Sequence, residues 1–87
     1  MKKRLNASIQ TLVGIVTPFA WDEYDRVSEV SLSATDDEEY LIENGARFIN
    51  LVQKPIRAVG MVKSGKKVHR AINIKKFELL ESAWLGD

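Results

Sequence analysis

The chain has 87 residues, 45% of them apolar and 29% charged, with a formal net charge of +1. A chain of this size buries about 60–70% of its unfolded surface, so we expect a single domain, residues 1–87, around one modest core. The sequence contains no cysteine and one histidine, which excludes disulfides, thiolate metal sites and thiol nucleophiles.

The N-terminal segment does not have the pattern of a targeting sequence. "MKKRL" carries the positive charge of a signal peptide, but "NASIQTLVG" lacks the uninterrupted apolar stretch that must follow. No window approaches the ~20 apolar residues of a membrane span. We therefore expect a cytoplasmic protein that does not contact a membrane, with residues 1–8 as a flexible segment.

Two strands are predicted in the first half of the chain. Residues 10–21 are rich in β-branched and aromatic side chains, and their glycine and proline indicate a bend. "WDEYD" then breaks the pattern, after which Val30 and Leu32 alternate with serines. This alternation is typical of a half-buried strand with Val30 and Leu32 pointing inward.

The next segment, residues 36–44, allows two interpretations. After the acidic turn "DDEE", the run from Tyr40 to Ile42 ends at Asn44-Gly45, a strong turn dipeptide, which favours a short strand. Thr35 and Glu38 also satisfy the capping-box spacing, so the alternative is a helix closed by Gly45. We favour the strand.

A short helix and a hairpin are predicted in the second half. Phe48, Leu51 and Val52 have helical spacing, and Pro55 cannot continue a helix. "PIRAVGMV" and "KVHRAINIKKFELL" are then strands that flank the turn "KSGK". Residues 82–87 are expected to form a C-terminal turn in which Trp84 folds back onto the barrel.

One pattern occurs twice, as "VGIV" at residues 13–16 and "VGMV" at residues 59–62. Glycine weakens a strand interior, so its presence at matching places indicates sharp bends where a small sheet closes. Five strands with a short helix between the third and fourth are the arrangement of a partly open Greek-key barrel, here about residues 10–81.

These segments resemble the OB-fold superfamily, and more closely its small stand-alone bacterial members, whose role is uncharacterised. The resemblance lies in "LVGIVTPFAWDEYDRVSEVSL", "GARFINLVQKPIRAVGMV" and "INIKKFELLE". It implies a barrel closed in the strand order 1, 2, 3, 5, 4. It also implies that ligands meet the face of strands 2 and 3, between the loops that join strands 1 to 2 and 4 to 5.

The charges are segregated along the chain. Residues 22–43 contain nine acidic residues and one base, Arg26, whereas residues 44–76 contain nine bases and no acid. The dense carboxylates of residues 36–39 lack the alternating ligands and central glycine of a calcium loop, so they indicate a solvated turn. No phosphate loop, metal-binding helix or nucleophile elbow is present, so we expect no enzymatic activity and no cofactor.

The best candidate site is the basic hairpin between the last two strands. Its cationic side chains would contact successive phosphates of single-stranded DNA or RNA, and an exposed aromatic would stack a base. The predicted binding residues are Lys63, Lys66, Lys67, His69 and Arg70, with Tyr40 or Trp21 as the stacking group.

Two observations argue against nucleic acid. The predicted outer row of the second strand has no aromatic: it consists of Glu29, Ser31, Ser33 and Thr35. Phe48 and Phe77 lie in periodic apolar segments and are expected in the core. The alternative is therefore a protein-interaction or assembly module that uses the acidic and basic arms, including self-association. The remaining interpretation is that the charges only solvate a small barrel.

Overall fold

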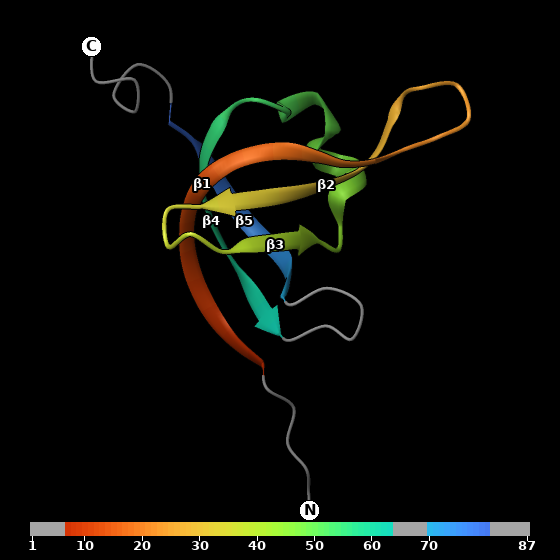
Figure 1. Cartoon of the computed structure of the whole chain (residues 1–87). Coiled ribbons are helices and arrows are strands. Elements are labelled where there is room, and N and C mark those ends of the chain that lie inside the picture. Colours follow the sequence, from red (N-terminus) through yellow and green to blue (C-terminus); the bar gives the residue numbers. More distant parts are fainter. Residues whose placement is uncertain (1–6, 64–69, 81–87) are drawn as a thin grey trace, which may run out of the picture.

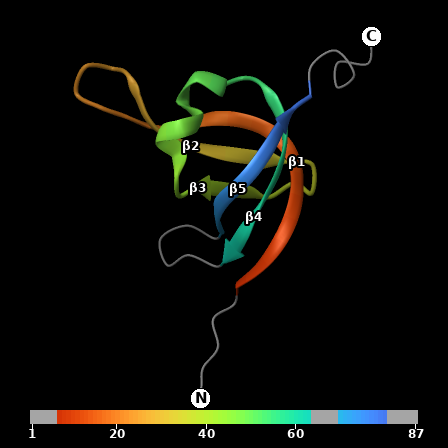
Figure 2. The same ribbon diagram turned by 180° about the vertical axis from the view of Figure 1, so that it is seen from behind.

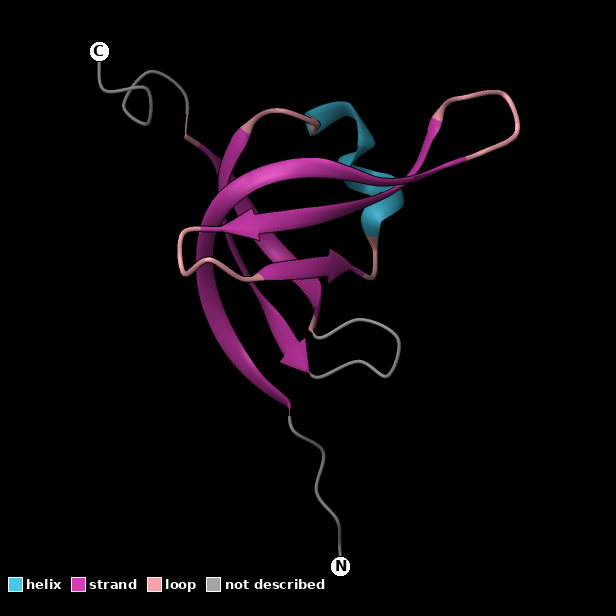
Figure 3. Ribbon diagram, in the orientation of Figure 1, coloured by secondary structure: helices cyan, strands magenta, loops and turns pink. Residues whose placement is uncertain are grey.

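The computed structural model describes residues 7–63 and 70–80, which form one strongly curved sheet (Figure 1). Its elements are β1 (Ala7–Trp21), β2 (Val27–Ala34), β3 (Glu39–Ile42), the 3-10 helix η1 (Gly45–Leu51), β4 (Pro55–Lys63) and β5 (Ala71–Leu79). The strands close into a barrel in the order β1-β2-β3-β5-β4. Figure 3 shows that strands make up most of the described residues and that η1 is short. The prediction of a mainly β chain with five strands and one short helix is confirmed.

Three sequence-based boundaries need correction or comment. The helix considered for residues 36–44 is wrong, because β3 occupies Glu39–Ile42. β1 begins at Ala7, so residues 7 and 8 of the expected flexible segment belong to a strand. The predictions for the Ser64-Gly65 turn and for the C-terminal turn with Trp84 lie outside the described residues.

The closure of the barrel depends on β1, which pairs with two neighbours. Residues 7–15 pair with β4 and residues 14–21 pair with β2, both antiparallel, so Gly14 belongs to both ladders. A side chain at Gly14 would overlap the carbonyl of Ser33, and one at Gly60 would overlap the carbonyl of Asn73. Both glycines of the repeated pattern are therefore needed where neighbouring backbones cross closely.

The core lies inside this ring. Val16, Val30, Leu32, Ile56 and Ile72 are fully shielded from solvent. They come from four different strands, so burying them requires the whole ring to be closed. The inward direction predicted for Val30 and Leu32 is confirmed.

The helix η1 covers one end of the barrel (Figure 1). Its Phe48 is buried and meets Phe77 of β5 edge to face, with the ring centroids 5.0 Å apart. Phe77 itself is 42% exposed, so only Phe48 has the core position expected for both. Among the described residues, no helix has the length and apolar character needed to cross a bilayer.

The seam between β3 and β5 is the shortest in the ring and the only parallel one. Leu41 pairs with Ala71 and Ile42 with Ile72. Beyond them the side chain of Asn44 continues the ladder, since its Nδ2 donates to the Ile74 carbonyl at 2.8 Å and its Oδ1 accepts from the Ile74 N–H at 3.0 Å. One amide side chain thus satisfies both polar groups of a buried backbone position.

Candidate functional site

The basic hairpin was the first candidate, and the structure describes the residues where it joins β4 and β5. Lys63 ends β4, and Arg70 directly precedes β5. Lys66, Lys67 and His69 lie outside the described residues. The Nζ of Lys63 is 3.1 Å from Oε2 of Glu43, and the Nε of Arg70 is 3.4 Å from Oε1 of Glu38. Both described bases of the hairpin therefore face carboxylates of their own chain.

These two ion pairs lie at the two ends of β3. Glu38 precedes the strand and Glu43 follows it, while Lys63 and Arg70 belong to the β4–β5 side of the ring. All four side chains are partly exposed, so each pair contributes at most about 1 kcal/mol. The opposite charges of residues 22–43 and 44–76 thus meet across the β3–β5 seam.

Tyr40 lies in the core with 4% of its surface exposed. Its hydroxyl donates a 2.6 Å hydrogen bond to Oδ2 of Asp36. Burial, the hydrogen bond and the negative charge of Asp36 together raise the pKa of Tyr40 to about 12. The same hydrogen bond, with a further one from the Glu38 N–H and the positive charge of Arg70, lowers the pKa of Asp36.

The stacking role predicted for Tyr40 does not fit this position. A base needs an exposed ring face, and the Tyr40 ring is enclosed by the barrel. The strand period already contained the signal, because Tyr40 and Ile42 are two residues apart and share the inward face of β3.

Trp21 is exposed but lies far from the basic hairpin. It is the last residue of β1, whereas Lys63 pairs with Ala7, the first residue of the same strand. In Figures 1 and 2 the end of β4 and the loop joining β1 to β2 lie at opposite ends of the barrel. The described members of the predicted site are therefore not gathered on one face: Tyr40 is in the core, and Trp21 lies at the other end of β1 from Lys63.

The loop end of the β1–β2 hairpin extends away from the barrel (Figure 1). We call residues 18–30 the projecting hairpin. It carries three of the exposed large hydrophobic side chains of the described residues: Phe19, Trp21 (56% exposed) and Tyr24 (69% exposed). Of these three residues, the sequence predicted a binding role only for Trp21.

Asp22 organises the turn of this hairpin. Its Oδ1 accepts hydrogen bonds from the N–H groups of Tyr24 at 2.8 Å and Arg26 at 3.0 Å, and its Oδ2 lies 3.2 Å from the Nε of Arg26. Hydrogen bonds from Arg26 and Tyr24 lower the pKa of Asp22. The Arg26 guanidinium also lies 5.1 Å from the centre of the Tyr24 ring. The one base of residues 22–43 is thus engaged within the turn, while Glu23 and Asp25 stay exposed.

The outer row of β2 differs from the prediction at Ser31. This residue is 0% exposed although it faces away from the core, because Thr17 and Glu39 cover it from the neighbouring strands. Its Oγ donates to Oε2 of Glu39 at 2.6 Å and is 3.0 Å from Oγ1 of Thr17. Ser31 is therefore a link between three strands and does not belong to an open ligand face.

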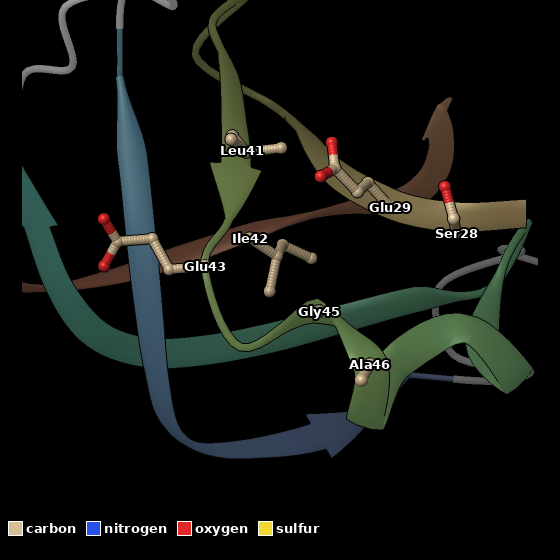
Figure 4. Close-up of a pocket in the computed structure, with 7 residues that line it drawn as sticks. All are labelled: Ser28, Glu29, Leu41, Ile42, Glu43, Gly45 and Ala46. Carbon is tan, nitrogen blue, oxygen red and sulfur yellow. The ribbon is translucent and has the colours of Figure 1, made fainter. Parts of the chain in front are cut away.

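A pocket of 270 Å³ lies where β2, β3 and η1 meet. It is lined by Ser28, Glu29, Leu41, Ile42, Glu43, Gly45 and Ala46. In Figure 4 the side chain of Glu29 extends beside that of Leu41, while Glu43 points toward β5. The lining combines the apolar side chains of Leu41, Ile42 and Ala46 with the polar ones of Ser28, Glu29 and Glu43. The sequence marked this region as acidic but gave no sign of a pocket.

A metal-binding cluster is not found in the described ranges 7–63 and 70–80. No cluster of three or more acidic or histidine side chains there has the geometry to hold a metal ion. The short contact between Ser31 and Glu39 joins a serine that is 0% exposed to a carboxylate at the surface. No protein-family model, curated protein or solved structure matches the chain.

Proposed function

We propose that the chain is a non-enzymatic OB-fold module that binds another protein through the projecting hairpin and the adjoining outer surface of β2 and β3. The OB-fold assignment is supported by the ring order β1-β2-β3-β5-β4, by the parallel β3–β5 pair and by a short helix between β3 and β4. The fold alone does not decide the ligand, so the proposal depends on the surface residues.

The observation that carries the proposal is the combination of exposed aromatics with carboxylates on one hairpin. Trp21 and Tyr24 are the residue types that most often dominate protein interfaces, because they bury much area at a low entropic cost. Glu23, Asp25 and Glu29 lie on the same hairpin and no described ion pair involves them. A partner with basic side chains around an apolar patch fits this surface.

The same residues disfavour a phosphate backbone at this surface. A single strand of nucleic acid that stacked a base on Trp21 would bring its phosphates close to Asp22, Glu23 and Asp25. Each phosphate would meet like charge and would lack the cations whose counterion release drives such binding. Tyr40, the other predicted stacking residue, is enclosed in the core.

Single-stranded nucleic acid is the second candidate, and one observation favours it elsewhere on the barrel. Lys76 and Phe77 line a pocket of 240 Å³ together with Arg57, Val59 and Glu78. Phe77 is a partly exposed aromatic next to the exposed bases Lys75 and Lys76. An argument against nucleic acid there is that Nη1 of Arg57 lies 2.7 Å from Oε1 of Glu78, so the charge of Arg57 is already paired within the pocket.

Site-specific photo-crosslinking in cells that express the protein tests the proposed function. A photoreactive phenylalanine analogue at position 24 is compared with one at position 9, since Ile9 is similarly exposed and lies near the opposite end of β1. We expect nuclease-resistant protein adducts from position 24 and few from position 9. Adducts that nuclease digests, or equal yields at both positions, would contradict the proposal.

A further inference from the structure

The edge of β2 that faces away from β1 is only partly covered. β3 pairs with residues 31–33 of β2 and then turns into η1. Residues 27–30 of β2 therefore have no strand neighbour on that side among the described residues. At Val30 the edge is covered by Gly45 of η1, whereas a pocket separates Gly45 and Ala46 from Ser28 and Glu29. Ser28 has no partner in β3, and in the β1 ladder it is the extra residue of an irregularity, because Glu29 pairs with Ala20 and Val27 with Trp21. An edge of this kind is a template for an additional strand.

The other edge of the projecting hairpin is protected. β1 pairs with β4 as far as Ile15, and the polar groups of Val16 bond to Gln53 and Lys54 at 2.7 Å and 3.1 Å. Two residues further along, the backbone of Pro18 faces the same edge, and proline has no N–H to donate. Proline is a common device for blocking strand addition, and β2 has no proline along residues 27–30. Strand addition is thus directed to β2.

The pocket of 270 Å³ borders this open edge through Ser28 and Glu29. Its volume lies below the range of about 300–1,000 Å³ usual for small-molecule sites and suits a single side chain. Leu41 and Ile42 supply apolar lining for an alkyl chain, and the Glu29 carboxylate is exposed and outside every described ion pair. Lysine and arginine combine an alkyl stem with a cationic end, which is the chemistry that this pocket complements.

We infer that β2 accepts an extended segment of a partner protein as an additional strand along residues 27–29, with a lysine or arginine of that segment in the pocket beside Glu29. The inference rests on the proposed function and specifies its mode of binding. Backbone hydrogen bonds to Ser28 and its neighbours supply affinity, and the pocket supplies specificity. The partner is a different protein, because the edge that a second copy could offer, residues 27–30 of its own β2, contains no lysine or arginine for the pocket.

The test uses the full chain, labelled with ¹⁵N, and a blocked hexapeptide in which arginine and valine alternate between terminal serines. Backbone amide shifts are followed at about 20 mM and about 200 mM salt, because exposed charge pairs weaken with ionic strength. We expect the largest shifts at residues 27–30 and 41–46, and weaker binding at the higher salt. A hexapeptide with glutamate in place of arginine is expected not to bind.

Variants of the protein and of the peptide separate the contribution of backbone pairing to binding from that of charge. Ser28→Pro removes a backbone amide from this part of β2 and is expected to weaken binding about tenfold, whereas Ser28→Ala keeps the amide and is expected to lose much less affinity. On the ligand side, proline in place of the central valine has the same expected effect on the unchanged protein, so the test does not depend on Ser28→Pro folding. Glu29→Gln is expected to weaken binding about three- to tenfold and to reduce its salt dependence.

Wild-type affinity for the proline-containing peptide would overturn strand addition, and shifts centred on Lys76 and Phe77 would place the peptide on the wrong surface. Shifts at residues 27–30 that grow with protein concentration in the absence of peptide would make a second copy the occupant and would also overturn the inference. If crosslinks from position 24 to a protein persist while the peptide fails to bind, the mode of binding is wrong and the proposed function stands.

Discussion

Acidic side chains serve two different purposes at the β3–β5 seam and on the projecting hairpin. At the seam, Glu38 and Glu43 face Arg70 and Lys63 across a short parallel pairing. On the hairpin, Glu23, Asp25 and Glu29 face solvent beside exposed aromatics. A carboxylate stabilises the fold where a base of the same chain lies opposite it. Where no such base lies opposite, the carboxylate is available to a partner. Variants of the seam should therefore change stability, and variants of the hairpin should change binding.

The largest expected effect on the seam comes from Asn44→Ala. It removes two hydrogen bonds and leaves the polar backbone groups of buried Ile74 without partners, so the free energy of unfolding should fall by about 1–3 kcal/mol. Urea denaturation followed by circular dichroism measures it. Asn50→Ala is the matched control, because Asn50 is exposed in η1 and makes no described side-chain hydrogen bond, and it should stay within about 0.5 kcal/mol of the wild type.

Equal stability of Asn44→Ala and Asn50→Ala would show that the seam does not depend on this amide. Binding of the hexapeptide to Asn44→Ala, measured where the variant is still folded, should be close to that of the wild type. This second readout separates the two regions directly.

The second largest expected effect is a pH dependence of the free energy of unfolding, which comes from the Tyr40–Asp36 hydrogen bond near the start of β3. The pKa of Tyr40 is about 12 in the folded protein and about 10 in an unfolded chain, so its contribution is fully present below pH about 10 and is lost as the pH rises toward 12. The pKa of Asp36 is lowered on folding, so its contribution is present above its ordinary pKa of 3.8 and is lost as the pH falls through the lower folded value.

Tyr40→Phe removes this hydrogen bond while keeping the ring. Its stability should become less dependent on pH between about 10 and 12, and its acid unfolding should shift because Asp36 loses the main cause of its lowered pKa. Denaturation curves across pH 2–12 compare it with the wild type. An alkaline loss of stability as steep as that of the wild type would assign the effect to other groups.

The smallest expected effect belongs to the Lys63–Glu43 pair. Both side chains are partly exposed, so removing either charge should cost about 0.2–1 kcal/mol. A double-mutant cycle of Lys63→Met and Glu43→Gln isolates the coupling, and added salt should reduce it. A coupling indistinguishable from zero at low salt would mean that the opposite charges only lie near each other.

Much of the fold was predictable from local patterns. The alternation around Val30 and Leu32 gave the second strand and its inward face, and Gly14 and Gly60 marked places where backbones cross. What local patterns could not give is register. Ser31 looks exposed by alternation, yet it is buried because register places Thr17 and Glu39 beside it.

The candidate site was less predictable, because it depends on contacts between distant segments. The partners of Lys63 and Arg70 lie 20 and 32 positions earlier in the chain, at Glu43 and Glu38, and only the ring order brings them together. Phe77 is half-exposed because β5 has an irregularity next to it: Ile74 and Lys76 pair with adjacent residues of β4, so Lys75 is an extra residue. Such a bulge changes the side-chain direction along a strand, which period-two reasoning does not anticipate.

The central claim is that the projecting hairpin recognises protein and does not bind nucleic acid. The most direct measurement is the fluorescence of Trp21 in a Trp84→Phe variant, titrated at about 20 mM salt with single-stranded oligothymidylate and, separately, with the arginine–valine hexapeptide. We expect the peptide to change the emission with saturation and the oligonucleotide to leave it unchanged. Saturable quenching of Trp21 by the oligonucleotide, abolished at high salt, would contradict the claim.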